Sequence, residues 1–181
     1  SHQRFVAEPI AELSQMSPWP PAMAGVFTSM LASLSALLRP MLEQPVRQIP
    51  IHGDCHIGNI LWRDGPMLVD LDDCLMGPAI QDLWMLLSGD EADQRMQLDA
   101  LLAGYEEFCE FDLSQLRLIE PLRTARMIHH LAWLDRRWED PAFPKAFPWF
   151  HDDSFWLTQR QQMTEQLTRL KAPPLSLTPY H

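Results

Sequence analysis

Residues 51–73 read IHGDCHIGNILWRDGPMLVDLDD, and this stretch decides most of what the sequence predicts. Two short apolar runs, 59–62 and 67–71, flank the triplet Asp64-Gly65-Pro66. Apolar runs on either side of an Asp-Gly pair predict a β-hairpin. Proline suits a tight two-residue turn poorly, so we expect a longer loop at the tip.

The polar residues around this hairpin have the types that phosphoryl transfer requires. Asp54 and Asn59 lie five positions apart ahead of the hairpin, and Asp70 follows its far strand, sixteen positions after Asp54. Such a reaction needs one group to orient or deprotonate the attacking hydroxyl and others to hold magnesium against the phosphates. Mg²⁺ prefers a few oxygen ligands. An amide and a carboxylate satisfy it and leave a second carboxylate as a base.

The order of these residues resembles a known family. His52-Gly53-Asp54, then Asn59 and an apolar strand ending in Asp70, is similar to the motif of aminoglycoside phosphotransferases and of choline and homoserine kinases. It also parallels the His-Arg-Asp and Asp-Phe-Gly motifs of protein kinases. The longer string through GPAIQDLWMLLSGD at 77–90 closely resembles the stress response kinase A group, protein kinases built on the aminoglycoside-phosphotransferase fold. The resemblance is dense over 51–90 and looser to residue 138.

The resemblance implies a role for each matching residue. Asp54 would be the catalytic base. Asn59 and Asp70 would bind Mg²⁺ beside ATP, which makes Asp70 a catalytic residue as well. His52 would brace the catalytic loop, and Asp82 would hydrogen-bond its backbone from the start of a buried helix.

The rest of the chain predicts a mainly α protein with one small β-hairpin, which fits the C-terminal, helical lobe of the kinase-like fold. Helical spacing of apolar residues begins near Val26, and we expect Pro40 and Pro45 to end that helix. Four further helices are expected. The first spans 79–88, and the second runs from an Asp90 cap to about residue 109. The third runs from an Asp112–Gln115 capping box to about residue 138, with a break near Pro121, and the last spans 154–170.

We expect four parts along residues 1–181: an inter-lobe linker (1–20), a catalytic core with the metal hairpin (21–90), a helical subdomain (91–170) and a tail (171–181). None of the seven glycines forms a G-x-G, and the two lysines, Lys145 and Lys171, lie outside strand-like runs. A kinase needs a phosphate-covering loop and a strand lysine. The resemblance therefore predicts that an N-terminal, ATP-covering lobe is missing, and that the parent protein is roughly twice as long and is needed for activity.

Composition narrows the partners and the compartment. The formal net charge is −10, which provides no general attraction for nucleic acid or for anionic membranes. No apolar run reaches the roughly 18 residues of a membrane span. The three cysteines match no zinc pattern, and reduced thiols indicate the cytoplasm.

Other interpretations compete at several positions. His52, Cys55 and His56 could bind zinc, although three ligands within five residues is poor geometry for it. Asp72 and Asp73 are either additional metal ligands or solvated loop acids. His129 and His130 are adjacent and cannot share a helix face. An aromatic group could form a substrate patch, but we favour core packing: Trp133, Trp138, Phe143, Phe147, Trp149 and Phe150.

Three functions remain open from the sequence. ATP-dependent phosphorylation of protein Ser/Thr hydroxyls comes first, and a small-molecule kinase on the same fold comes second. The third is a non-catalytic interaction lobe. Leu71-Asp72 stands where protein kinases have Phe-Gly, which leaves a protein-kinase-like activation switch in doubt.

Overall fold

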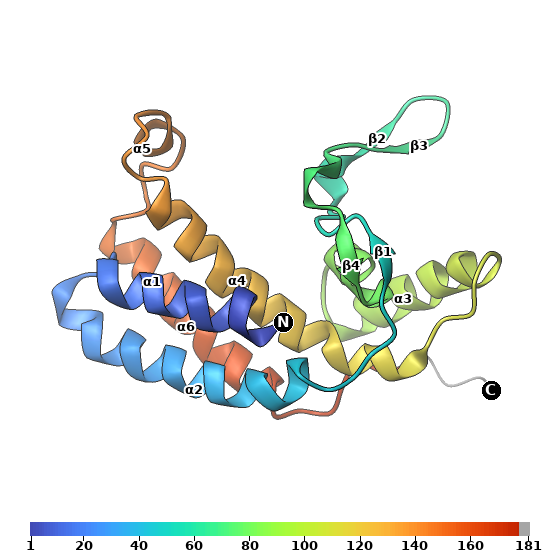
Figure 1. Ribbon diagram of the computed structural model, residues 1–181, viewed down its shortest axis with the longest axis horizontal. Coiled ribbons are helices and arrows are strands. Elements are labelled where there is room, and N and C mark those ends of the chain that lie inside the picture. Colours follow the sequence, from blue (N-terminus) through green and yellow to red (C-terminus); the bar gives the residue numbers. More distant parts are fainter. Residues whose placement is uncertain (178–181) are drawn as a thin grey trace. The chain divides into compact units, whose positions relative to one another are not determined.

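The computed structural model describes residues 1–177, which form two compact units. The helical unit comprises Ser1–Gln44 and Glu120–Pro173, and the hairpin unit comprises Pro45–Ile119 and the residues from Pro174 on. Helices dominate the first, whereas the second contains all four strands of the described residues (Figure 1). The predicted fold class, mainly α with a small β-hairpin, is confirmed.

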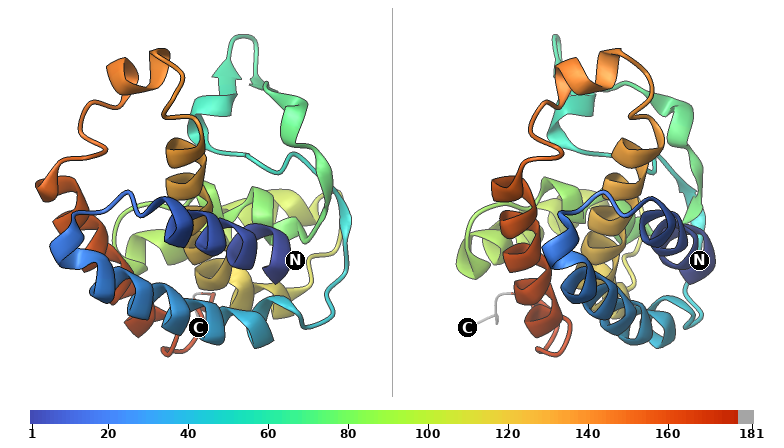
Figure 2. Two further views of the ribbon diagram at one scale, coloured as in Figure 1. Left: turned by 60° about the vertical axis from the view of Figure 1, so that its left-hand side comes forward. Right: turned by 90° about the vertical axis from the view of Figure 1, so that its left-hand side faces the viewer.

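The helical unit is built around one apolar core. Its elements are a π-helical turn η1 (Gln3–Ala7), α1 (Glu8–Met16), a 3₁₀ turn η2 (Pro21–Met23), α2 (Ala24–Leu42), α4 (Ile119–Arg136), α5 (Ala142–Ala146) and α6 (Asp153–Arg169). Helices α2 and α6 pack against each other (Figure 2). Trp19, Phe27 and Trp156 form an aromatic group within the core, with ring centroids 5.2–6.0 Å apart.

The first 45 residues are more helical than their prolines suggest. Residues 1–20, which we expect to be an inter-lobe linker, are largely helical, and Val6 and Leu13 repeat at helical spacing and are fully buried. Helix α2 does not end at Pro40 but contains it. Proline removes one N–H and its bond to the preceding turn. The last turn closes beyond it, where the Glu43 N–H donates to the Arg39 carbonyl at 3.1 Å.

One described segment, Pro21–Leu42, is long and apolar enough to cross a membrane by length and composition alone. The expectation that no segment reaches this length is therefore wrong. Within the structure, Phe27, Leu34 and Leu38 of this segment are fully buried in the core of the helical unit. A core helix passes the same composition test.

The hairpin unit consists of short elements: β1 (Ile49–Ile51), β2 (Ile60–Trp62), β3 (Pro66–Leu68), β4 (Leu75–Gly77), α3 (Glu91–Glu106) and the 3₁₀ turns η3 (Ile57–Asn59), η4 (Leu71–Asp73), η5 (Ala79–Asp82), η6 (Trp84–Leu86) and η7 (Leu113–Leu118). The predicted hairpin is confirmed as the antiparallel pair β2–β3, with Ile60 opposite Leu68. A second antiparallel pair, β1–β4, places Ile49 opposite Gly77. This pair brings the start and the end of the 51–73 stretch together.

The segment 79–88 is not the α-helix we expected. It forms two 3₁₀ turns, η5 and η6, closed by i→i+3 bonds such as the Leu83 N–H to the Ile80 carbonyl at 3.1 Å. Asp82 therefore lies at the end of η5 and not at the start of a helix. From these turns the side chains of Gln81 and Asp82 bind the backbone of His52 and Gly53.

Capping predictions succeed in part. Asp90 and Asp93 form a capping box at the start of α3, with each side chain accepting from the other's N–H. Asp112 caps η7 by accepting the Ser114 N–H at 3.0 Å, but the Gln115 side chain does not complete a box. It is buried and accepts the Ile80 N–H at 3.2 Å instead. The expected break near Pro121 lies at the junction of η7 and α4, where proline fits the first helical turn.

Candidate active site

The candidate site is the loop between β1 and β2, and Gly53 allows its tight path. Gly53 has φ of +87°, and a Cβ added there would clash with the carbonyl oxygen of Asp73 and would lie 2.6 Å from the Leu75 side chain. Only glycine adopts this conformation at no steric cost. The loop thus passes directly beside the segment that follows Asp70.

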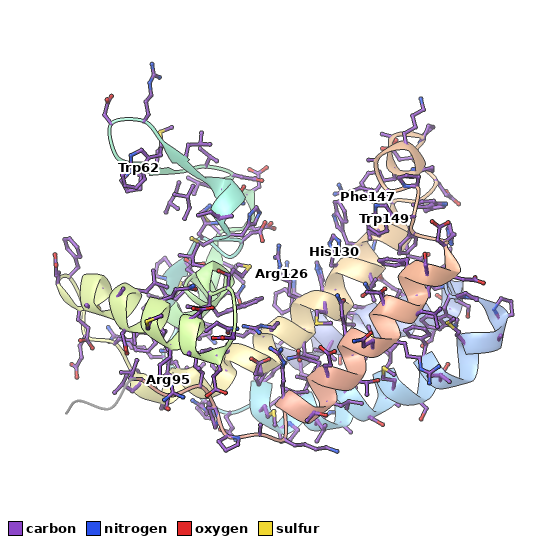
Figure 3. The ribbon with its side chains drawn as sticks, turned by 180° about the vertical axis from the view of Figure 1, so that it is seen from behind. Trp62, Arg95, Arg126, His130, Phe147 and Trp149 are labelled. Atoms are coloured by element: carbon purple, nitrogen blue, oxygen red, sulfur yellow. The ribbon has the colours of Figure 1, made fainter. Side chains whose placement is uncertain are left out.

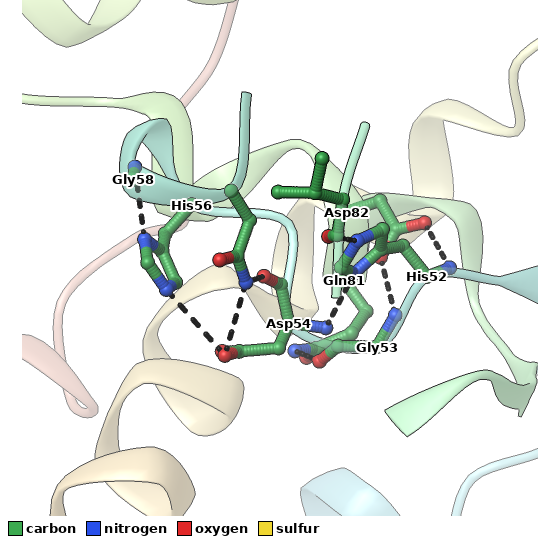
Figure 4. Close-up of polar contacts among 9 residues, drawn as sticks. His52, Gly53, Asp54, His56, Gly58, Gln81 and Asp82 are labelled. Atoms are coloured by element: carbon green, nitrogen blue, oxygen red, sulfur yellow. Dashed lines mark hydrogen bonds and ion pairs between the residues drawn. The ribbon is translucent and has the colours of Figure 1, made fainter. Parts of the chain in front are cut away.

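Two neighbouring side chains from η5 anchor this loop (Figure 4). The Asp82 carboxylate accepts the backbone N–H groups of His52 at 2.7 Å and Gly53 at 2.9 Å. The Gln81 amide donates to the Gly53 carbonyl at 3.1 Å, and its oxygen accepts the Trp84 indole N–H at 3.3 Å. Bonds to a carboxylate are among the stronger hydrogen bonds in proteins. The backbone entering Asp54 is therefore fixed on both its donor and its acceptor side.

His52 connects the loop to the strand segment before Asp70. It is 6% exposed, its Nδ1 accepts the Asp54 N–H at 3.3 Å, and its Nε2 lies 2.8 Å from the Val69 carbonyl. Because Nδ1 accepts, Nε2 carries the proton and donates to Val69. The His52 ring therefore connects Val69, the residue before Asp70, to the backbone of Asp54.

Asn59 is buried and directly contacts Asp54. Its amide nitrogen donates to the Asp54 carbonyl at 3.0 Å and lies 3.5 Å from Oδ2 of the same residue. The Asn59 carbonyl also accepts the Val69 N–H at 3.0 Å. With the amide nitrogen directed at Asp54, the amide oxygen is the atom that remains to coordinate a cation.

Asp70 follows Val69 in a left-handed backbone conformation, with φ of 61° and ψ of 66°. Aspartate and asparagine are among the few non-glycine residues that adopt this region readily. The carboxylate is exposed, and so are Asp72 and Asp73 in the following turn η4. The structure thus joins Asp54 and Asn59 directly, and it ties Asp70 to them through Val69, whose N–H and carbonyl are both bound.

The donor atoms of this group fit a hard divalent cation better than zinc. Asp54, Asn59 and Asp70 offer only oxygens, which Mg²⁺ prefers. Both ring nitrogens of His52 are engaged. Burial, then the nearby Asp82 and Asp54, raises the pKa of the Cys55 thiol, so the thiolate that zinc needs is disfavoured. Across residues 1–177 no three His, Cys, Asp or Glu side chains gather as a metal site.

Two residues of the loop network were missed or misjudged from the sequence. Gln81 stood unremarked beside Asp82, although its amide holds the loop carbonyl. His56 was considered only as a zinc ligand, yet its Nε2 lies 3.5 Å from the Asp54 carboxylate. The residue that could have indicated this position of His56 is Gly58, two positions later. Because glycine has no side chain, it leaves room for the His56 imidazole ring.

The aromatic residues of the loop 140–150 belong to the core of the helical unit, except Trp149, which is exposed and lies outside the core cluster, so the core prediction is wrong for it. Phe150 is fully buried, and Trp133, Trp138, Phe143 and Phe147 pack against the core cluster, which favours the packing interpretation. His129 and His130 contact different rings, as expected for adjacent residues of a helix. The ring centroid of His129 lies 6.0 Å from that of Phe5, and the ring centroid of His130 lies 5.6 Å from that of Trp133. Figure 3 labels His130 on α4 and Phe147 and Trp149 in the segment that follows it.

Comparison with known proteins finds one matching family and several similar relatives. Residues 7–119, more than half of the chain, match the model of the phosphotransferase enzyme family. The chain is 49% identical over 177 residues to stress response kinase A of Escherichia coli strain K12, covering 98% of this chain and 54% of that protein. It is 60% identical over 131 residues, 72% of this chain and 40% of each relative, to stress response kinase A of Salmonella choleraesuis and to serine/threonine protein kinase RdoA of Salmonella typhimurium. The chain spans about half the length of the curated relatives it matches.

Proposed function

Because the chain belongs to the phosphotransferase enzyme family, we propose that the full-length protein containing it transfers the γ-phosphoryl group of ATP to a hydroxyl acceptor, with Mg²⁺. The observation that supports this most directly is the Asp54–Asn59 contact beside the fixed Val69–Asp70 segment. It supports Asp54 as a candidate base beside the amide of Asn59, with the Asp70 carboxylate directly after the hydrogen-bonded residue Val69. That is the set of groups that phosphoryl transfer uses.

Each residue has a distinct part in this proposal. Asp54 accepts a hydrogen bond from the acceptor hydroxyl and takes its proton as the new O–P bond forms, while the bond from the γ-phosphorus to the bridging oxygen breaks and ADP leaves with the electron pair. The Asn59 amide oxygen and the Asp70 carboxylate would hold Mg²⁺, which supplies charge neutralisation for the phosphate oxygens when bound. His52, Gln81 and Asp82 keep the Asp54 backbone in place. Positioning of this kind accounts for a large part of the catalysis in such reactions.

We propose protein Ser/Thr hydroxyls as the acceptor and the cytoplasm as the compartment. The acceptor proposal is supported by the names of relatives, stress response kinase A and a serine/threonine protein kinase, at 49–60% identity. The compartment proposal is supported by three cysteines that are all free thiols: Cys55, Cys74 and Cys109. The two alternatives to a protein acceptor are that the full-length protein phosphorylates small molecules, or that this lobe has no catalytic role.

The decisive experiment replaces Asp54 with asparagine in the full-length protein. We expect transfer to protein Ser/Thr residues to fall by about 10²–10⁴, the range of general-base contributions. Affinity for ATP should change little, because Asp54 acts on the acceptor. Asp64→Asn is the matched control, since Asp64 is an exposed acid at the hairpin tip. Activity of Asp54→Asn within threefold of wild type would exclude Asp54 as the base, and transfer only to small hydroxyl compounds would replace the protein acceptor.

A companion measurement tests the metal ligands. Asp70→Asn should raise the Mg²⁺ concentration for half-maximal activity more than Asn59→Ala does, because Asp70 brings the only full charge of the pair. Asparagine is the suitable substitute because it also tolerates the left-handed backbone. Equal midpoints for the two variants would contradict Asp70 as the principal ligand. Calorimetric titration of the chain with Mg²⁺ gives a readout that does not depend on activity.

A further inference from the structure

His56 is oriented by a bond within its own loop. Its Nδ1 accepts the Gly58 backbone N–H at 3.0 Å (Figure 4). A neutral imidazole carries its proton on the nitrogen that does not accept. The other nitrogen, Nε2, is therefore an N–H donor, and it lies 3.5 Å from Oδ2 of Asp54. The tautomer needed to donate to the candidate base is thus set by the backbone.

Gly58 makes this orientation sterically possible. A Cβ added at Gly58 would lie 2.8 Å from Cε1 and 3.0 Å from Nδ1 of His56, and apart from its chain neighbours it would meet no other residue within 4 Å. Gly58 has no positive φ that would demand glycine. Its lack of a side chain therefore serves to accommodate the His56 ring.

The two donors on this loop converge on one oxygen of the base. His56 Nε2 and Asn59 Nδ2 both lie 3.5 Å from Asp54 Oδ2. His56 directly precedes the turn η3 (Ile57–Asn59), and Asn59 is its last residue. Two donors at one carboxylate oxygen restrict rotation of the carboxylate, and a general base must be aimed at its proton to act.

We propose that His56 is a positioning residue that holds the Asp54 carboxylate in its catalytic orientation through an Nε2–H contact, with Gly58 fixing the tautomer and the ring. This proposal rests on the proposed function, since it concerns the same base. It assigns His56 an indirect role, through Asp54, and no contact with ATP or metal.

The expected size of the effect follows from the geometry. A distance of 3.5 Å is at the outer limit of a hydrogen bond, so the contact restrains Asp54 weakly. In the full-length protein, His56→Ala should lower kcat about tenfold, against about 10²–10⁴ for loss of the base itself. The KM for ATP and the Mg²⁺ midpoint should stay within twofold of wild type. His56→Gln, whose amide can also donate, should recover part of the lost kcat.

A second variant perturbs the ring without removing it. Gly58→Ala should displace the imidazole and lower kcat in the same direction as His56→Ala. Gly104→Ala is the matched control, because a Cβ there meets nothing within 4 Å. In a double-mutant cycle, His56→Ala should have almost no further effect on an Asp54→Asn protein, because interacting residues are not additive.

These outcomes separate the positioning role from the proposed function. If Asp54→Asn abolishes transfer and His56→Ala leaves kcat unchanged, the role of His56 is overturned while the function stands. A fall in Mg²⁺ affinity and ATP affinity along with kcat would overturn it as well, because that pattern indicates collapse of the whole loop. If Asp54→Asn retains activity, the proposed function itself fails. Nitrogen chemical shifts of His56 in the chain report its tautomer without any assay, and an Nδ1–H form would contradict the inference.

Discussion

Different interactions stabilise the interior of the helical unit and the interior of the hairpin unit. Most of the largest fully buried side chains are in the helical unit, among them Trp156, Phe27 and Phe150. In the hairpin unit, the loop between β1 and β2 is held by hydrogen bonds from His52, Gln81 and Asp82. Apolar burial tolerates small shifts, whereas hydrogen bonds fix atoms in direction and distance. The contrast indicates that the helical unit contributes mainly folding stability, whereas the hairpin unit fixes the positions of the loop atoms.

The hairpin unit also leaves apolar side chains exposed, which the helical unit does much less. On and around β2–β3 these are Ile57, Leu61, Trp62, Met67, Leu68, Leu71 and Met76. An isolated two-stranded hairpin is marginally stable in water. The ordering of this region therefore depends on the polar network at its base, and three substitutions test the contrast.

The largest expected effect on stability is in the helical unit. Trp156→Ala should lower the free energy of unfolding by about 3–5 kcal/mol, because it empties a fully buried position among four aromatic neighbours. The Trp156 indole N–H has no hydrogen-bond partner, so the loss is one of packing alone. Chemical denaturation measures it, with Leu157→Ala, a half-exposed neighbour on α6, as the control. A loss below about 1 kcal/mol would contradict the assignment of the core.

A smaller effect with a sharper location is expected at Asp82. Asp82→Ala leaves the His52 and Gly53 N–H groups without their acceptor, at a cost of about 1–3 kcal/mol. Hydrogen exchange should accelerate at these two amides while α2 and α6 keep their protection. Asp64→Ala is the control on the same unit. Equal acceleration in both units would show that Asp82 supports the global fold and not the loop.

The smallest effect is expected at Asp135, a polar residue in the helical unit. Burial raises its pKa above the ordinary value of 3.8, while His151 lowers it and Glu12 raises it further. A raised folded-state pKa means that the folded protein binds more protons, so stability falls as pH rises through the interval above 3.8. Asp135→Asn should therefore be more stable than wild type at neutral pH. The difference should shrink as the pH falls toward 3.8.

Melting temperatures over this pH range test the sign, with the exposed Glu139→Gln as the control. A stability difference that is constant with pH would mean that Asp135 acts through packing and not through its charge.

The sequence predicted elements that depend on local patterns. The β2–β3 hairpin, α3 with its Asp90 cap and α6 follow from turn residues and apolar spacing, and all three are confirmed. The apolar run 79–88 was misjudged as one helix, and its Gln81 and Asp82 side chains bind residues about thirty positions away, which a local pattern does not reveal. The β1–β4 pair was also missed, because neither strand carries an alternating apolar pattern that would predict it.

Within the site, residue types could be predicted but contacts could not. The roles of Asp54, Asn59 and Asp70 remain predictions, whereas their positions relative to Val69 come only from the structure. The left-handed backbone at Asp70 leaves no trace in the residue order. The link between His56 and Gly58 also depends on where the ring folds back, and a glycine alone does not specify that.

The exposure of Trp62 at the hairpin has an optical consequence. Trp62 is 80% exposed, whereas Trp19, Trp84 and Trp156 are at most 7% exposed. Water shifts indole emission to longer wavelengths, so the red edge of the fluorescence spectrum should be weighted toward Trp62. Iodide, a quencher that stays in water, should reach this ring first. A Trp62→Phe variant would identify its share, and any molecule that covers β2–β3 could then be titrated by its protection from quenching, without an attached dye.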